Sequence, residues 1–406
     1  MISIYLHIPF CMQKCPYCDF SSFDDKAYLI DDYIKAMGVE LKYYTDNFAG
    51  RLNLESHKRS LADNLLAQAA EAQAKEGTVP SEAAKLIRTN TLYIGGGTPS
   101  FLSFRQLDAL FTEIYTHFPR PGFREVTIEV NPETLSENKA KVIALNVNRA
   151  SLGCQSFDDA LLKTLGRPHN AERARRAAED LKKFGVTNLN IDLIFGIPGQ
   201  TAEGVASDIR EAVKLGAGHI SFYSLTAYEH TPFFERRNEL PSDDKSEELY
   251  NAGCAELKAH GFEHYEISNF AKPGARCRHN MAYWNLDEYI GIGTAASSFF
   301  DGKRYTNIRD IERYVKLMKI PDDPAETCEE TDNEKMLKEH IMLKLRTAEG
   351  ISYADFKARF GFEFADRYSK IIGKYAGSVY AQAEEEGFKL TEKGFFVSNS
   401  IISSFF

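Results

Sequence analysis

Three of the seven cysteines in this chain lie within eight residues near the N-terminus. At the spacing Cys11-x3-Cys15-x2-Cys18, each thiolate can bind one iron of a [4Fe–4S] cluster, and the fourth iron is left without a protein ligand. An iron without a protein ligand is open to a bound small molecule. The run therefore predicts a site of cofactor chemistry in the loop that carries it.

Two other uses of cysteine compete with a cluster. A disulfide framework is disfavoured because the cysteine count is odd and the other four cysteines are scattered, at Cys154, Cys254, Cys277 and Cys328. A tetrahedral zinc site that combines the N-terminal cysteines with His7 stays open as the alternative. Zinc sites usually draw on two separated cysteine pairs, which this run does not provide. The spacing therefore favours the cluster.

The elements that must position this loop follow from the apolar pattern. Six short apolar runs, rich in β-branched and aromatic residues, predict buried parallel strands at residues 2–7, 91–95, 125–131, 149–155, 188–195 and 219–225. Amphipathic stretches between them predict helices at residues 28–48, 104–118, 136–146, 171–184 and 202–215. Six β/α units predict an α/β fold, a complete or partial (β/α)6 TIM-like barrel whose functional face lies at the C-terminal strand ends.

Polar residues gather at these predicted strand ends. The segment Gly95-Gly96-Gly97-Thr98-Pro99 follows the second strand, where glycine lets the backbone press against a ligand, although a tight turn is the alternative. Four more polar or charged residues belong to or follow the later strands: Glu129, Gln155, Arg167 and Asp192. Each alone is more often an ion-pair partner than a ligand. Their gathering on one face favours a ligand site.

Length and charge narrow the class of protein. A chain of 406 residues can form a full α/β core and a second unit. Its 49 Lys and Arg against 58 Asp and Glu give a net charge of −9, which repels a phosphate backbone and disfavours nucleic-acid binding. No apolar run reaches the ~18 residues of a membrane span. We expect a cytoplasmic protein with reduced thiols and a small-molecule or protein partner.

Three segments together resemble the radical S-adenosylmethionine (SAM) superfamily. They are Tyr5-x-His7-Ile-Pro-Phe-Cys11-x3-Cys15-x-Tyr17-Cys18, the Gly-Gly-Gly-Thr-Pro segment that begins at Gly95, and the Gly-Ile-Pro-Gly-Gln-Thr segment that begins at Gly196. The resemblance covers nearly the whole chain. Within the superfamily, the chain looks like the branch that contains oxygen-independent coproporphyrinogen III oxidase and its relatives, the haem chaperones.

The resemblance implies a set of cofactor ligands. Cys11, Cys15 and Cys18 hold a [4Fe–4S] cluster, and SAM chelates the fourth iron through its amino and carboxylate groups. The residues that match the family's SAM contacts are Tyr5, Tyr17, Gly96, Gly97, Thr98, Glu129, Gln155, Arg167 and Asp192. Their chemistry suits SAM, because glycine backbone and carboxylates can bind an amine or ribose hydroxyls, and a guanidinium can bind a carboxylate.

Two places separate the two relatives. The cysteine motif of the oxidase continues to a fourth cysteine, whereas this chain has Asp19 and Phe20 there. Residues 278–284, Arg-His-Asn-Met-Ala-Tyr-Trp, are similar to the His-Asn-x-x-Tyr-Trp motif of the haem chaperones. Because haem iron takes a neutral imidazole as an axial ligand, His279 is the candidate haem ligand. A hydrogen-bonded core histidine and ligation by Cys277 remain the alternatives.

The resemblance implies a haem chaperone that binds haem and a SAM-ligated cluster and delivers haem to an acceptor protein, such as a membrane respiratory protein. An electron donor for the cluster is then a further partner, and no nucleic acid is expected. The alternative is an enzyme like the oxidase, which takes a hydrogen atom from a porphyrinogen propionate before decarboxylation. The sequence leaves open whether SAM is cleaved.

Two segments depart from a compact barrel. Residues 51–88 are rich in Ala, Gln and Glu and predict a helical insertion within a barrel domain that spans residues 1–320. After a proline-containing linker, residues 325–406 predict a C-terminal winged-helix-like module of the type found in the oxidase branch. Its predicted elements are helices at 333–345 and 353–360 and strands at 388–391 and 395–397. Winged helices often bind DNA, but the acidic charge of this chain argues against that role.

Overall fold

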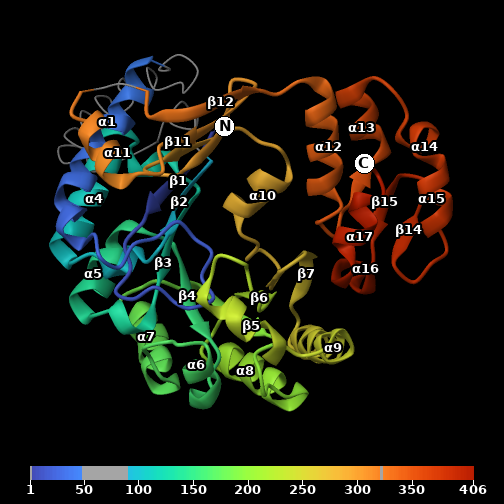
Figure 1. Ribbon diagram of the computed structural model, residues 1–406, viewed down its shortest axis with the longest axis horizontal. Coiled ribbons are helices and arrows are strands. Elements are labelled where there is room, and N and C mark those ends of the chain that lie inside the picture. The colour runs from blue at the N-terminus through green and yellow to red at the C-terminus, as the bar shows by residue number, and fades with distance from the viewer. Residues whose placement is uncertain (1, 48–89, 321–322) are drawn as a thin grey trace, which may run out of the picture.

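Six parallel strands form the centre of the computed structural model, which describes residues 2–47, 90–320 and 323–406. Each of these strands pairs with the next in chain order. They are β1 (Ser3–Ile8), β2 (Thr91–Gly96), β3 (Glu125–Val130), β4 (Arg149–Gln155), β5 (Asn188–Phe195) and β6 (His219–Ser224). Figure 1 shows them side by side in the middle of the molecule. The sequence prediction of six parallel strands is confirmed.

Helices cover the outer face of these strands (Figure 1). The ones that follow successive strands are α1 (Ile30–Asn47), α4 (Phe104–His117), α5 (Glu137–Asn146), α7 (Ala171–Lys183) and α8 (Ala202–Lys214). Two helices that the sequence did not predict are α6 (Asp159–Thr164) and α9 (Asp243–Ala259). Strands β1 and β6 do not pair with each other, so the predicted (β/α)6 barrel is confirmed as an open one.

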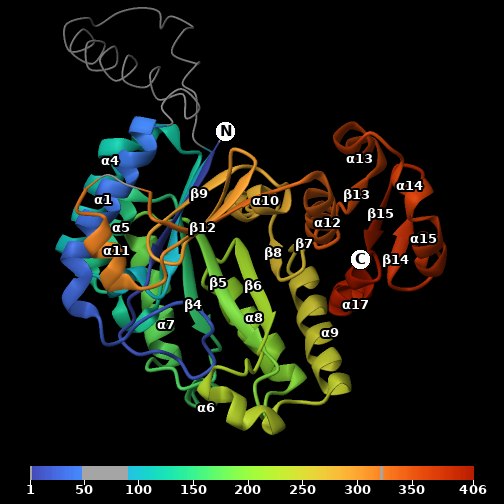
Figure 2. The ribbon, with the colours of Figure 1, turned by 45° about the horizontal axis from the view of Figure 1, so that its top comes forward.

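Six further strands extend the sheet beyond both ends of the barrel (Figure 2). Beyond β1 lie β9 (Tyr289–Ile292), β10 (Ser297–Phe300), β11 (Lys303–Asn307) and β12 (Ala325–Glu330). Beyond β6 lie β8 (Asn269–Ala271) and β7 (Glu263–Glu266). Two short helices belong to the same region, α10 (Arg278–Trp284) and α11 (Ile311–Leu317). The sequence predicted none of these elements.

Local signals determine where the barrel helices begin. Before α4, the Ser103 hydroxyl accepts a hydrogen bond from the Gln106 backbone N–H, and the Gln106 side chain accepts one from the Ser103 N–H. Before α8, the Thr201 hydroxyl accepts a hydrogen bond from the Gly204 N–H at 3.0 Å. Each cap satisfies backbone donors that the first helical turn leaves unpaired. The last residue of the Gly-Ile-Pro-Gly-Gln-Thr segment therefore has a structural role as a helix cap.

A buried carboxyl group joins α1 to the sheet extension. Glu40 accepts hydrogen bonds from the Gly293 N–H at 2.8 Å, from the Asn307 amide at 2.7 Å and from the Tyr314 hydroxyl. Burial raises the pKa of Glu40 to about 7, although these donors oppose the shift. A carboxyl pKa that is higher in the folded than in the unfolded chain stabilises the fold most at low pH.

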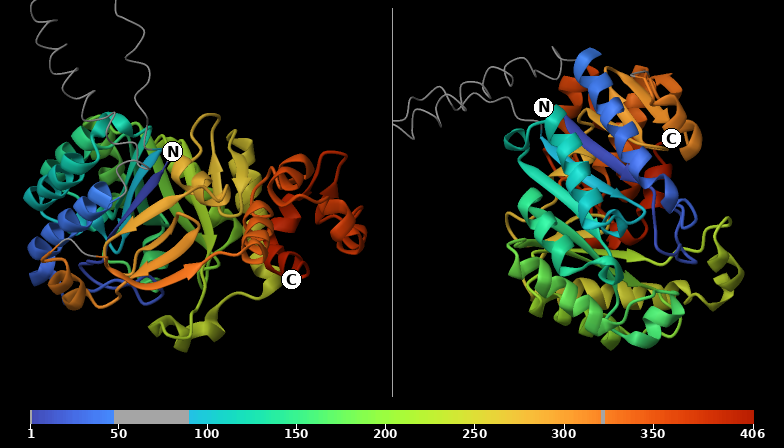
Figure 3. Two further views of the ribbon diagram at one scale, coloured as in Figure 1. Left: turned by 90° about the horizontal axis from the view of Figure 1, so that it is seen from above. Right: turned by 90° about the vertical axis from the view of Figure 1, so that its left-hand side faces the viewer.

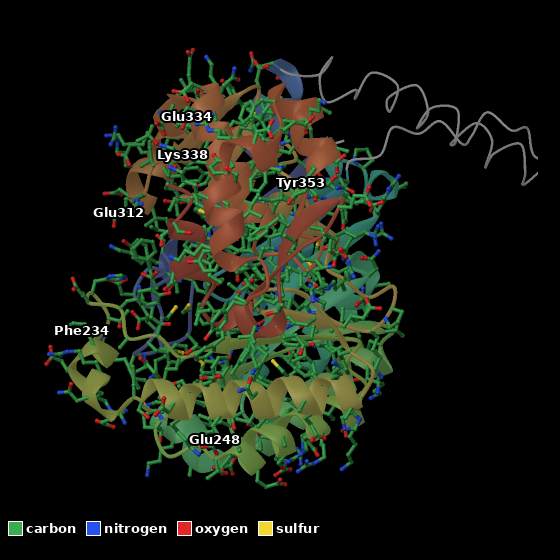
Figure 4. The ribbon with its side chains drawn as sticks, turned by 90° about the vertical axis from the view of Figure 1, so that its right-hand side faces the viewer. Phe234, Glu248, Glu312, Glu334, Lys338 and Tyr353 are labelled. Carbon is green, nitrogen blue, oxygen red and sulfur yellow. The ribbon has the colours of Figure 1, made fainter. Side chains whose placement is uncertain are left out.

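We expect Glu40 to make the fold less stable as pH rises from its unfolded pKa of 4.5 through 7. The free energy of unfolding should fall by about 3 kcal/mol over this window through this one group. Urea unfolding of Glu40→Gln between pH 5 and 8 should show a shallower decline than the wild type. The exposed variant Glu248→Gln is the control (Figure 4). Equal pH slopes in Glu40→Gln and the wild type would contradict this expectation.

The C-terminal segment forms a separate hydrophobic core beside the barrel (Figure 3). Its helices are α12 (Asn333–Lys344), α13 (Tyr353–Phe360), α14 (Phe364–Arg367), α15 (Ser369–Tyr375), α16 (Glu392–Phe396) and α17 (Ser398–Ser403). Its three antiparallel strands, in the order β13 (Ile351–Ser352), β15 (Gly387–Leu390) and β14 (Ala381–Ala383), form a small sheet. Glu334 and Lys338 mark the solvent-facing side of α12 (Figure 4).

One predicted element of this module is wrong. Residues 395–397 were expected to form a strand, but Phe395 lies in the helix α16. The Thr391 hydroxyl accepts a hydrogen bond from the Gly394 N–H at 3.1 Å and so caps that helix. The apolar run Phe395-Phe396-Val397 fits either structure locally, and burial of Phe395 against His264 selects the helix. The hairpin of the module is instead β14 with β15.

Two other predictions concern the boundaries of the domains. The helical insertion predicted at residues 51–88 lies outside the described residues. The division between residues 320 and 325 stays a prediction, and the structure adds that β12 pairs with β11 as the last strand of the large sheet.

Within residues 2–47, 90–320 and 323–406, no helix is long and apolar enough to cross a membrane.

Candidate functional site

A cavity of about 470 Å³ opens at the C-terminal ends of the barrel strands. It brings together most of the residues that the sequence singled out. These are Cys11, Cys15, Tyr17, Cys18, Gly96, Gly97, Thr98, Glu129, Gln155, Arg167 and Asp192. They come from the loop after β1 and from four other strands and their loops, so folding of the barrel assembles the site.

The cysteine loop lies at the mouth of this cavity. The Cys11 N–H donates to the Phe23 carbonyl at 2.9 Å, and the Cys18 N–H donates to the Cys15 carbonyl at 3.0 Å, so the loop is folded back on itself. Burial raises the pKa of the Cys11 and Cys18 thiols. In the described part of the chain, no group of three or more His, Cys, Asp or Glu side chains is placed to hold one metal ion. All three cysteines line the same cavity.

Glycine is required where the loop after β2 passes the cysteines. A Cβ atom at Gly97 would lie 2.9 Å from the Phe10 carbonyl oxygen and 3.0 Å from the Cys11 sulfur. Gly96 has φ +117°, and a Cβ there would lie 2.7 Å from the His7 ring. The side-chain-free backbone therefore leaves a cradle beside Cys11. This cradle fits a ligand that contacts a cluster through its own polar groups.

Glu129 presents a carboxyl group to the cavity from β3. It accepts hydrogen bonds from the Tyr93 hydroxyl at 2.8 Å and from the Gly96 N–H at 3.0 Å. Burial, together with the charge of Asp192, raises the pKa of Glu129 to about 7. Such a carboxyl group can exchange a proton near neutral pH and can accept hydrogen bonds from an amine or a hydroxyl.

Arg167 connects the cysteine loop to the barrel. Its guanidinium donates to the Cys15 sulfur at 3.3 Å, to the Asn131 side-chain oxygen at 3.0 Å and to the Gly153 carbonyl at 3.2 Å. The Glu133 carboxylate lies 3.5 Å away, and both side chains of this pair are almost completely buried. A buried guanidinium beside the cysteine loop is suited to bind a carboxylate through paired hydrogen bonds.

Gln155 and Asp192 line the cavity from β4 and β5. Gln155 has φ +70°, an unusual value for a residue with a side chain, and accepts a hydrogen bond from the Tyr223 hydroxyl at 2.9 Å. Asp192 accepts a hydrogen bond from the Asn190 amide at 2.7 Å, and burial raises its pKa. Strained backbone of this kind gathers at ligand sites.

Tyr5, which matches a SAM contact of the family, does not line this cavity. Its hydroxyl group hydrogen-bonds the His7 ring at 2.9 Å, and its ring stacks with Tyr93. It lines a second cavity of about 640 Å³, which also contains Tyr283 and Arg304. Its assignment as a SAM contact stays a prediction.

His279 is 1% exposed and lies near the N-terminal ends of the strands. Its Nδ1 is 2.6 Å from the hydroxyl of Thr91, the first residue of β2, and its Nε2 is 2.8 Å from the Tyr283 hydroxyl. Burial lowers its pKa to about 3, so the imidazole is neutral. The structure thus places His279 as a hydrogen-bonded core residue. In this conformation it can bind iron only after one of these two hydrogen bonds breaks.

Several polar residues of the site were not singled out from the sequence. Asn131 donates to the Thr98 hydroxyl at 2.9 Å and accepts from Arg167, so it links the glycine loop to the cysteine loop. Ser151 and Asn190 line the barrel interior together with Arg149. Polar residues at alternate positions of otherwise apolar strands were the available signal, because alternate side chains of a strand share one face.

Comparisons with known proteins show which families this chain is similar to. A model of the radical SAM superfamily matches residues 5–212, and a model of the HemN C-terminal domain matches residues 331–397. The protein named "Heme chaperone HemW" of Lactococcus lactis is 34% identical over 99% of this chain and 97% of its own length. The protein of the same name from Bacillus subtilis is 30% identical over 100% of this chain and 99% of its own length.

A solved structure shares the whole fold. Coproporphyrinogen III oxidase (HemN) from Escherichia coli aligns with 100% of this chain and 89% of its own, with a TM-score of 0.79 and 20% identity. That likeness concerns the fold alone. The superfamily model spans about half of the chain, and both relatives match it nearly from end to end. This chain belongs to the HemW family within the radical SAM superfamily.

Proposed function

We propose that this protein is a haem chaperone, which binds haem together with a SAM-ligated [4Fe–4S] cluster and delivers the haem to an acceptor protein. The observation that carries the proposal is the match along nearly the whole chain to relatives named as haem chaperones. Phe20 supports it, because an exposed phenylalanine stands at the mouth of the cavity, where the oxidase motif has a fourth cysteine.

Membership of the radical SAM superfamily implies a [4Fe–4S] cluster and SAM as cofactors. Cys11, Cys15 and Cys18 would hold the cluster. The other cavity residues that match the family's motifs would hold SAM, with Arg167 suited to its carboxylate and Glu129 to its amine or ribose hydroxyls. The cluster, when bound, supplies the electron for SAM chemistry.

The remaining partners follow from this role. A haem-acceptor protein must receive the haem, and an electron donor must reduce the cluster if SAM is cleaved. None of the seven cysteines is in a disulfide, which suits a reducing, cytoplasmic setting. The alternative function, porphyrinogen oxidation like that of the structural neighbour, predicts carbon dioxide release from coproporphyrinogen in the presence of SAM.

We propose His279 as the haem ligand, and a titration of ferric haem tests both the ligand and the function. The anaerobically reconstituted wild-type protein should give a saturable shift of the Soret band. His279→Ala should bind haem at least tenfold more weakly or with a different Soret maximum, because the iron loses an imidazole. It should also unfold about 1–3 kcal/mol more easily, since Thr91 and Tyr283 lose their buried partner.

The matched control is His340→Ala, which removes another buried histidine, from α12. It should leave the haem titration unchanged. Identical titrations of the wild type and His279→Ala would remove His279 as the ligand and leave Cys277 as the candidate. If the wild-type protein binds no haem, the chaperone function is wrong and the oxidase-like alternative takes its place.

A further inference from the structure

The cavity that begins at the cysteine loop continues along the inside of the barrel. Its inner end is lined by Arg149, Ser151, Asn190 and Asn280. Arg149 is the first residue of β4, and Gly153 on the same strand accepts the hydrogen bond from Arg167 beside the cysteines. Four residue steps along a strand span about 13 Å. The inner end is therefore separate from the cysteines proposed to hold the cluster, and it adjoins the proposed SAM residues through Asp192, to which Ser151 and Asn190 donate hydrogen bonds.

Arg149 is only 2% exposed, yet its guanidinium lacks the partners that a buried cation normally has. Its Nε atom has no hydrogen-bond partner, and no hydrogen bond or ion pair joins the guanidinium to another residue of the described ranges. Burial opposes the charge of Arg149, and Glu125 offsets this only through space and without a hydrogen bond, so the donors of Arg149 are free for an anion from outside.

The two carboxylates near Arg149, those of Glu125 and Asp192, already accept hydrogen bonds from other groups. Glu125 accepts hydrogen bonds from the backbone N–H groups of Arg278 and His279, each at 3.1 Å. Asp192 accepts hydrogen bonds from Asn190 and Ser151. Neither carboxylate forms an ion pair with Arg149, so the free hydrogen-bonding capacity of Arg149 is available to a ligand.

Asn280 provides a second polar group at the same place. It belongs to α10, in the Arg-His-Asn-Met-Ala-Tyr-Trp segment, and it lines the cavity. In the described part of the chain its side-chain amide has no hydrogen bond. The helix α10 lies between the barrel strands and α12 (Figure 1). The segment thus buries His279 behind the cavity and presents Asn280 to it.

We propose that Arg149 and Asn280 bind a propionate carboxylate of the tetrapyrrole at the inner end of the barrel cavity. The proposal rests on the haem-chaperone function and adds where an anionic group of haem is bound. The propionates are the anionic groups at the haem periphery, and a guanidinium with an amide can give a carboxylate several hydrogen bonds, some of them charge-assisted. Nothing in the proposal requires His279 to be the iron ligand.

The test compares ferric haem with its dimethyl ester, which lacks the carboxylates, in Soret titrations of the reconstituted full-length protein. The wild type should bind haem about 10- to 100-fold more tightly than the ester. Arg149→Gln should bind both alike, at the weaker affinity, and Arg149→Lys should keep part of the preference. Arg304→Gln, which changes an arginine of the second cavity, should behave as the wild type.

A second measurement separates ligand binding from structure. Without haem, Arg149→Gln should change the melting midpoint little, because the variant loses no direct hydrogen bond or ion pair of Arg149. A clear fall would assign Arg149 a structural role and overturn the proposal. The proposal would also be overturned if Arg149→Gln kept the preference for haem over the ester, if the wild type showed no such preference, or if Arg304→Gln lost it. None of these three results would contradict the chaperone function.

A titration with coproporphyrin III distinguishes failure of the site from failure of the function. If the wild type binds no haem but binds coproporphyrin III in a manner that depends on Arg149, the chaperone function is wrong and the carboxylate site holds. If the wild type binds neither tetrapyrrole, both proposals are overturned.

Discussion

Replacement of Cys15 by alanine is expected to abolish the [4Fe–4S] cluster. Cys11, Cys15 and Cys18 line one cavity. A cluster that has only three protein ligands is not held stably when one of them is lost. Anaerobic reconstitution of the wild type should give about four irons and four sulfides per chain, whereas Cys15→Ala should retain less than about one of each. The measurement is iron and sulfide content together with the charge-transfer absorption of the cluster.

The control for this experiment is Cys328→Ala. Cys328 lies exposed on β12 and takes no part in the cavity, so its loss should leave the iron and sulfide content unchanged. A Cys15→Ala protein with a full complement of iron and sulfide would refute the assignment of the three cysteines. A stoichiometric zinc content and no iron in the wild type would favour the tetrahedral alternative with His7.

Loss of the Arg167 charge is expected to weaken both the fold and the binding of SAM. In the wild type, the Glu133 carboxylate lies near the Arg167 guanidinium and 3.0 Å from the His169 ring. In Arg167→Gln, Glu133 loses the charge of Arg167 and keeps only His169 as a partner. Breaking a buried ion pair costs about 3–5 kcal/mol, and the remaining partner should hold the loss near the lower limit. SAM affinity of the reconstituted protein should fall about 10- to 100-fold, because a carboxylate loses a charge-assisted hydrogen bond.

Calorimetric titration with SAM and urea unfolding of the same preparations measure the two effects separately. Arg236→Gln serves as the control, since Arg236 forms an ion pair with Glu239 at the surface, where solvent screening leaves such pairs little effect on stability. Unchanged SAM affinity in Arg167→Gln would show that its guanidinium does not bind the SAM carboxylate. The role of Arg167 would then be limited to holding the cysteine loop against Asn131 and Gly153.

The barrel could be predicted because its signals are local. Buried parallel strands appear as short continuous apolar runs, and the turns and caps that separate them lie within a few residues. The strands β7 to β12 could not be found in this way, because they have three to six residues each and depend on partners far along the chain. The mistaken strand at Phe395 has the same origin, since its apolar run matches a strand and a helix equally well.

The candidate site also has features that the sequence could predict and features that it could not. By itself, the sequence determined the cysteine loop, the glycine segment and the polar residues at the strand ends, because close spacing and strand periodicity place them together in any barrel of this order. Only the tertiary structure decided the surroundings of α10 and of the barrel interior. It buried His279 between Thr91 and Tyr283, and it left the Nε of Arg149 without a hydrogen bond at the inner end of the cavity. The physical reason is that these contacts join residues of different strands and of α10, which meet only when the barrel assembles.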